Sequence, residues 1–202
     1  MNRTIQYRFY GWLILLLFAL SACAGTKLSS TNMNREFEGK YLSSVMVVGI
    51  SKNAKNKKIF EDAFVTQFKN NGVKALSGSS LFSPSIKIDR DLIKKTAMSK
   101  GIESVLVTSL KEIKKETEQI KVPITGSGGR AGIYIPGERY DSPTLEVAET
   151  RVIFESRLYE VKTEKMIWSA NSEVFDPKSV EETVKALSKT ILDNLRDNRL
   201  IR

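Results

Sequence analysis

Apolar positions after residue 40 recur with two different periods, which predicts an alternation of strands and helices. Residues 43–50 (SSVMVVGI) form a valine-rich apolar run, typical of a strand buried on both faces. Residues 57–71 carry apolar side chains at helical spacing, and a short strand at 73–76 and a helix at 89–100 follow. Residues 104–110 form a second buried run. This order of strand, helix, strand, helix and strand predicts an α/β layer.

The second half of the chain predicts a long β-hairpin followed by a closing helix. Residues 104–119 leave the core as an increasingly charged strand, residues 145–161 form a long strand, and residues 166–175 return beside it. In the returning strand, the side chains expected to face inward are Met166, Trp168, Ala170 and Val174. The last helix opens near Asp176-Pro177, with Ser179 and Glu182 in capping-box spacing. We therefore expect one α/β domain, residues 40–202, built on a single mixed sheet of about five strands with three helices.

A Gly/Pro-rich excursion, residues 123–143, separates the two long strands and protrudes from the hairpin. It holds five glycines, three prolines and two tyrosines. A loop of about 20 residues without its own structure is often functional. Arg130, Tyr134 and Tyr140 are residue types enriched at interfaces, so we predict that they contact a partner. The alternative, that the flanking strands merely extend the hairpin and that Tyr134 packs locally, stays open.

The amino terminus has the pattern of an export signal. Arg3 and Arg8 precede an unbroken apolar run at 12–20, which is shorter than the ~18 residues that a membrane-spanning helix needs. The charge, the short apolar run and the small residues after it are typical of a secretory signal, residues 1–22.

Leu20-Ser21-Ala22-Cys23 resembles the lipobox of bacterial lipoproteins. That resemblance implies cleavage between Ala22 and Cys23 and attachment of diacylglycerol to the Cys23 thiol, followed by a further acyl chain on the freed amine. Two or more acyl chains hold a protein in a membrane essentially permanently. By resemblance to sorting in enteric-type bacteria, Ala24 in place of Asp favours the outer membrane, facing the periplasm. Residues 23–39 lack a sustained apolar period, and we expect a lipidated cysteine and a flexible tether of about 20–24 Å.

The composition restricts the chemistry that the chain can perform. It has no histidine and one cysteine, so no His/Cys zinc site and no imidazole base can be built, and no cofactor is expected. Glu149 and Glu155 share a strand face, but about 20 Å separates them, too far for a glycosidase pair. Residues 126–131 match the letter of a dinucleotide motif, but the flanking prolines exclude the strand and helix that it requires.

Basic residues form two clusters in a chain of net charge +9. The clusters are Lys52, Lys55, Lys57 and Lys58, and Lys111, Lys114 and Lys115. Export removes nucleic acid as a partner, which leaves anionic lipid or a cell-wall polymer as functional interpretations. A solvated face that keeps the domain soluble is the favoured alternative.

Residues 158–169 (LYEVKTEKMIWS) carry a further resemblance. With the buried strand and helix before them, they resemble the TolB amino-terminal domain and the penicillin-binding-protein activator lipoproteins over residues 40–202. Glu164 stands where those families usually have glycine in the turn. The resemblance implies a non-enzymatic module that binds another envelope protein. A cell-wall-active or lipid-handling enzyme, or a self-associating subunit of an envelope assembly, are the alternatives.

Overall fold

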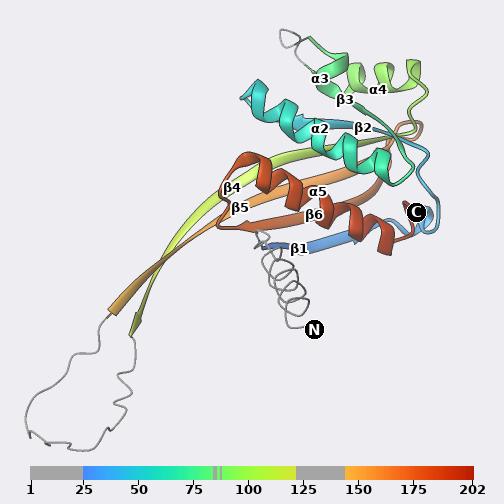
Figure 1. Ribbon diagram of the computed structural model, residues 1–202. Helices are drawn as coiled ribbons and strands as arrows, with labels where there is room; N and C mark the ends of the chain where they lie inside the picture. The colour runs from blue at the N-terminus through green and yellow to red at the C-terminus, as the bar shows by residue number, and fades with distance from the viewer. Residues whose placement is uncertain (1–24, 84–85, 87, 122–143) are drawn as a thin grey trace, which may run out of the picture.

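A six-stranded mixed sheet forms the centre of the computed structural model, which describes residues 25–83, 86, 88–121 and 144–202 (Figure 1). The strand order is β1-β6-β5-β4-β2-β3. The strands are β1 (Thr26–Met33), β2 (Ser44–Ile50), β3 (Lys74–Ser77), β4 (Ser104–Lys121), β5 (Thr144–Glu160) and β6 (Met166–Phe175). β2 pairs in parallel with β3 and β4, whereas all other pairs are antiparallel.

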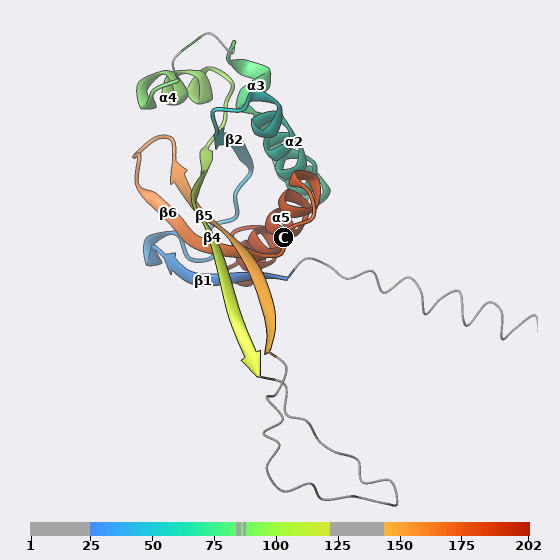
Figure 2. The same ribbon diagram turned by 90° about the vertical axis from the view of Figure 1, so that its left-hand side faces the viewer.

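Helices cover both faces of the sheet within the described residues (Figure 2). They are α2 (Ala54–Asn70), the single turn α3 (Gly78–Leu81), α4 (Arg90–Ser99) and α5 (Val180–Asp197), with a 3₁₀ turn η1 (Arg35–Phe37) after β1. α2 and α5 lie on one face, and α3 and α4 on the other. Ser179 caps α5 as predicted, because its side-chain oxygen accepts a hydrogen bond from the Glu182 backbone N–H.

Two apolar cores, one on each face, explain why β2 is apolar throughout. Val45 and Val47 belong to the core under α2 and α5, and Met46 and Val48 belong to the core under α3 and α4. Successive side chains of a strand point to opposite faces, so a strand covered on both sides needs apolar residues at every position. The expectation of an α/β fold on a mixed sheet is therefore confirmed.

The segment expected to be a flexible tether contains a sixth strand. β1 pairs antiparallel with β6 at the edge of the sheet, and its Leu28 and Met33 pack against the core under α5. The pairing register shifts between Leu28 and Ser30, so the two core-facing residues are separated by an odd number of positions. Such a bulge breaks the period-2 pattern, which is why the sequence showed no strand here. Residues 26–33 therefore belong to the sheet, whereas a tether was expected up to residue 39.

The inward side chains of β6 also differ in one place from the prediction. Trp168, Ala170 and Val174 are buried as expected, but Met166 is 36% exposed, and Ile167 is buried instead. The β5–β6 register shifts between Leu158 and Tyr159, opposite the start of β6. The alternation therefore holds from residue 168 onward and fails at the first residue of the strand.

β4 and β5 extend well beyond the other strands, as the charged end of the first long strand predicted (Figure 1). β2 ends at Ile50, opposite Ser109, and β6 ends at Phe175, opposite Arg151. Residues 114–121 and 144–151 continue past these ends as a two-stranded ribbon, which we call the arm. The rest of the described chain, which we call the body, contains both cores. The loop 123–143 expected at the tip of the hairpin lies outside the described residues.

Candidate functional site

None of the functional residues predicted from the sequence lies in the part of the chain that the structure describes. Ala22 and Cys23, the predicted cleavage and lipidation site, precede it, and Arg130, Tyr134 and Tyr140 fall between the two strands of the arm. The structure does describe the segments that lead to both regions. Their positions determine which end of the domain carries the predicted anchor and which end carries the predicted contact loop.

Both regions leave the domain at the same end of the sheet. Thr26, the first residue of β1, pairs with Val174 of β6. Val174 pairs on its other side with Val152 of β5, and Val152 pairs with Ile113 of β4, at the base of the arm. These residues form one row across four strands, so three strand spacings of about 4.8 Å, or about 14 Å, separate the start of β1 from the arm. The start of β1 and the base of the arm lie at this end in both views (Figures 1 and 2).

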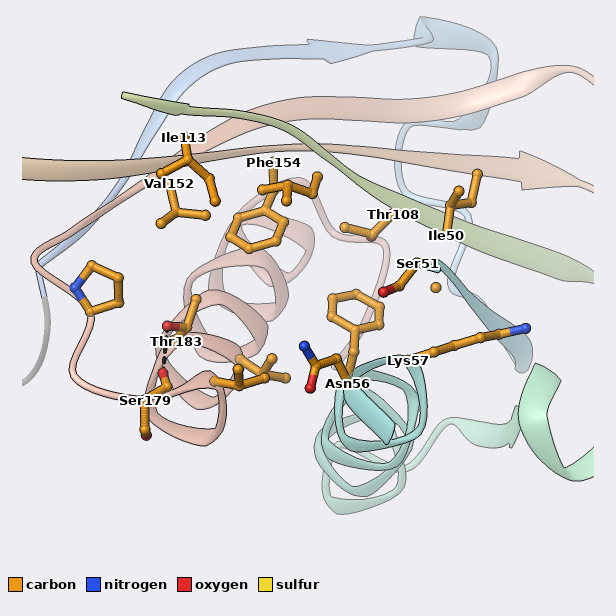
Figure 3. A pocket seen from close by; sticks show the side chains of 16 residues that line it. Ile50, Ser51, Asn56, Lys57, Thr108, Ile113, Val152, Phe154, Ser179 and Thr183 are labelled. Carbon is orange, nitrogen blue, oxygen red and sulfur yellow. Dashed lines mark hydrogen bonds between the residues drawn. The ribbon is translucent and has the colours of Figure 1, made fainter. Parts of the chain in front are cut away.

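An apolar groove of about 420 Å³ opens at this end, between the first turns of α2 and α5 (Figure 3). Strands β4 and β5 form one wall, and the helices form the other. Its apolar side chains are Ile50, Leu110, Ile113, Val152 and Phe154 from the strands and Phe60, Val180 and Val184 from the helices. The groove lies where β2 stops at Ile50 while β4 and β5 continue, so that β4 has no neighbouring strand on its β2 side beyond Ser109.

Four large apolar side chains on the groove are unusually exposed to solvent. Ile50 is 59% exposed, Ile113 55%, Leu110 48% and Val180 38%. Exposed apolar residues are normal when scattered, but a contiguous group of them on one groove marks a binding surface. The spacing along the chain gives no sign of this group, because its members come from three distant segments.

Two hydroxyl groups that line the groove are already hydrogen-bonded within the fold. The Thr108 hydroxyl pairs with the Ser156 hydroxyl at 2.8 Å, and the Thr183 hydroxyl donates to the Ser179 carbonyl oxygen at 2.7 Å. The latter contact is the dashed line in Figure 3. A catalytic nucleophile needs a base within hydrogen-bond reach and free access to a substrate, an arrangement that these paired hydroxyls lack. The groove offers apolar surface rather than reactive groups.

A buried carboxylate beside the groove has a structural role that the sequence did not reveal. Glu61 of α2 is fully buried, and it accepts hydrogen bonds from the backbone N–H groups of Gly49 at 2.9 Å and Ser79 at 2.5 Å. A Cβ at Gly78 would lie only 3.2 Å from its Oε1, so this close approach favours glycine. The carboxylate therefore ties α2 to the end of β2 and to α3. Its position within the apolar stripe of α2, next to Phe60, was the available signal.

Charged side chains of the arm pair with one another across its two strands. Glu116 and Glu149 face each other across the two strands, and the Arg151 guanidinium donates to them at 2.7 and 3.1 Å. The hydrogen bond to Glu149 raises the pKa of Arg151 above its ordinary value. Like charges placed opposite each other destabilise a strand pair, so Arg151 is the residue that makes this pairing favourable.

The structure brings the two lysine clusters to the end of the domain that holds the groove. Ile50 of β2 pairs with Ser109 of β4, so the cluster at 52–58 and the cluster at 111–115 begin next to each other. Lys58 pairs with Asp62 at 2.6 Å, and Lys111 lies 3.7 Å from Glu155. Lys52, Lys55 and Lys115 form no ion pair with the described residues.

Neither a metal-ligating cluster nor a membrane-spanning helix is found in the described part of the chain. No group of three His, Cys, Asp or Glu side chains there is arranged to hold a metal ion. No helix in the same part is long and apolar enough to cross a membrane.

Comparisons with known proteins returned solved structures alone. No protein-family model and no curated protein matches the chain. A PelC dodecamer from Paraburkholderia phytofirmans is 11% identical, with a TM-score of 0.46 over 84% of this chain and 95% of that chain. The lipoprotein GNA1162 from Neisseria meningitidis is 12% identical, with a TM-score of 0.43 over 77% and 99%. The LpoB C-terminal domain from Salmonella enterica is 16% identical, with a TM-score of 0.37 over 80% and 91%.

A bacterial lipoprotein is thus among the similar structures.

Proposed function

We propose that this chain is a lipid-anchored protein of the bacterial cell envelope that acts, without catalysis, as an accessory module binding another envelope protein through its arm. Cleavage after Ala22 and lipidation of Cys23 hold it in the outer membrane, facing the periplasm. The arm and the loop that it carries, with Arg130, Tyr134 and Tyr140, form the partner contact.

The observation that carries this proposal is the arm itself. An isolated two-stranded hairpin is marginally stable in water, because it buries little apolar surface. The arm nevertheless exposes Leu145 and Val147, at 56% and 47%. A ribbon that extends past its own core and exposes apolar side chains gains stability by burying them against another protein.

The start of β1 determines where such a partner would lie. Only Ala24 and Gly25 separate Cys23 from the first residue of β1. Three residues span at most about 11 Å, even when fully extended. The anchored end of the body therefore stays at the membrane surface, and the arm leaves from this end. The partner that fits this geometry is a protein embedded in the same membrane or bound to it.

The test is capture of the full chain from living cells after chemical cross-linking, followed by mass spectrometry. We expect one dominant envelope protein, which is lost when residues 126–140 are deleted. Self-cross-links alone would replace the adaptor with a subunit of an assembly. Recovery of nothing but lipid or cell-wall fragments would contradict partner binding.

The anchor is tested separately by fractionating cells that express the full chain with Cys23→Ala. We expect the native chain in the outer-membrane fraction and the variant released from it. A variant that stays in the outer membrane would contradict anchoring through Cys23, whatever the cross-linking shows.

A further inference from the structure

We propose that the apolar groove and the lysines beside it form a binding site for an anionic phospholipid of the membrane. The inference rests on the proposed anchor, since that anchor brings the groove to the bilayer. It assigns to the groove a role separate from the partner contact of the arm, and it makes the body a second point of attachment to the membrane.

The groove presents apolar surface of the kind that inserts into a bilayer. Ile50, Ile113 and Val180 stand on three sides of it, and each is more than one third exposed. Two of the polar side chains that line the groove, Thr108 and Thr183, have their hydroxyls hydrogen-bonded within the fold. An acyl chain against the strand wall therefore leaves neither hydroxyl unpaired.

The length of chain before β1 brings the groove to the membrane. The row from Thr26 to Ile113 spans about 14 Å, as three strand spacings. Cys23 lies three residues before Thr26, so the attached lipid starts within about 11 Å of that row. Together the two distances place Ile113 within about 25 Å of the lipidated residue. A lipid anchor at Cys23 therefore holds the groove against the headgroups.

The charge around the groove selects the kind of lipid. Lys52 and Lys55 lie beside and in the first turn of α2, and no ion pair with the described residues occupies them. Lys57 lines the groove itself (Figure 3), and its ammonium also lies 3.9 Å from the Glu61 carboxylate. The α5 side instead carries Glu181 and Glu182 in its first turn. A phosphate therefore finds its attractive position on the α2 side, with the acyl chain extending toward β4 and β5. Lysines near a membrane surface favour anionic over zwitterionic lipids.

Vesicle binding tests this site without the anchor. We would use the mature chain, residues 23–202, with Cys23→Ser; it contains every residue that the structure describes. Co-sedimentation would compare vesicles of phosphatidylcholine alone with vesicles that also contain phosphatidylglycerol. We expect binding to the phosphatidylglycerol vesicles, and an affinity lowered about tenfold or more by Ile50→Glu with Ile113→Glu, because charge is costly at the headgroup boundary. Lys52→Glu with Lys55→Glu should remove the preference for the anionic vesicles.

A matched control separates the groove from apolar exposure in general. Met98 of α4 and Met166 at the start of β6 are 59% and 36% exposed, and neither lines the groove. Met98→Glu with Met166→Glu should leave vesicle binding unchanged. Equal losses in the two double variants, or no loss in the groove variant, would overturn the site. Circular dichroism and thermal unfolding would verify that each variant is folded.

A single-thiol reporter locates the lipid directly, because the Cys23→Ser chain has no other cysteine. An environment-sensitive fluorophore on Ile50→Cys should shift its emission to the blue on adding phosphatidylglycerol vesicles, and the same fluorophore on Met98→Cys should not. A shift at neither position would overturn the proposal. If the partner is still captured from cells, the function proposed above would stand while this inference failed.

Discussion

The β4–β5 hairpin has an inner half, which belongs to the body, and an outer half, which is the arm. The same two strands run through both halves, but the surroundings of the two halves are opposite. In the inner half, Leu106 and Leu158 pair across the strands, and both are completely buried. In the outer half, Glu118 pairs with Val147, and both are exposed. The difference lies in the neighbours, since the inner half has strands on both sides and helices above it, whereas the arm has neither. The inner half therefore stabilises the fold, and the outer half keeps exposed side chains that the proposed partner could contact.

We expect the largest difference between the two halves when an apolar side chain is truncated in each and the free energy of unfolding is measured. Leu158→Ala removes a fully buried side chain and should lower the free energy of unfolding by about 2–5 kcal/mol. Val147→Ala in the arm should change it by less than about 0.5 kcal/mol. Urea unfolding of both variants measures the difference. Similar losses in the two variants would mean that the arm belongs to the same packed unit as the body.

The next effect compares a buried carboxylate with one of the arm. Glu61→Gln replaces a carboxylate that accepts two backbone hydrogen bonds. The side-chain NH₂ group of the glutamine then faces one of the two backbone N–H donors. We expect a loss of about 1–3 kcal/mol in the free energy of unfolding. Glu118→Gln, on the exposed arm, should cost less than about 1 kcal/mol. A neutral result for Glu61→Gln in thermal and urea unfolding would contradict the tie between α2, β2 and α3.

A smaller and local effect is expected within the arm. Arg151→Met removes the guanidinium that bridges Glu116 and Glu149, and two like charges then face each other. Amide hydrogen exchange should quicken at residues 115–119, by about fivefold for a local loss of ~1 kcal/mol, and stay unchanged at 104–108. Exchange that quickens equally along the whole of β4 would show that the two halves open together.

The smallest effect concerns the turn between β5 and β6, which lies at the end of β5 far from the arm. Glu164 has a φ of 59°, a left-handed conformation that favours glycine, and its carboxylate contacts Lys94 and Arg90 of α4. The hydrogen bond from Lys94, with the charge of Arg90, lowers the pKa of Glu164 below its ordinary value. These contacts offset the steric cost of a residue other than glycine at this φ.

That lowered pKa predicts a pH dependence. A carboxyl group with a lower pKa in the folded chain than in the unfolded chain adds stability above its unfolded pKa, and this contribution is lost as the pH falls through the folded pKa. Urea unfolding should therefore show that native chain and Glu164→Gln differ at pH 7 and converge in the acidic range below the ordinary glutamate pKa. A difference that persists unchanged into that range would contradict the ion pairs.

The sequence predicted the regular helices and strands well. It predicted poorly the surfaces that form where distant segments of the chain meet, and each outcome has a physical reason. β2 carries a continuous apolar run, and α2 and α5 carry apolar side chains at helical spacing, because each is packed along its length. β1 was missed because its bulge displaces Met33 by one position relative to Leu28. Local periodicity reports packing only where the register is regular.

The groove was not predictable from the spacing of its residues. Ile50, Ile113 and Val180 meet only because β2 ends early and α5 begins over β5. The lysine clusters were visible, but their position next to that apolar surface was not, since it depends on the parallel pairing of β2 with β4. The lipobox at Cys23 and the contact loop remain predictions from the sequence.

The contrast between a stable body and a partner-binding arm is tested most directly by site-specific photo-cross-linking in living cells. A photoreactive amino acid would replace Val147 on the arm or Met98 on α4, two exposed apolar positions in the full chain. We predict a cross-link from position 147 to one other envelope protein and none to that protein from position 98. Cross-links to that protein from position 98 alone, or no protein cross-link from position 147, would contradict the assignment of partner binding to the arm.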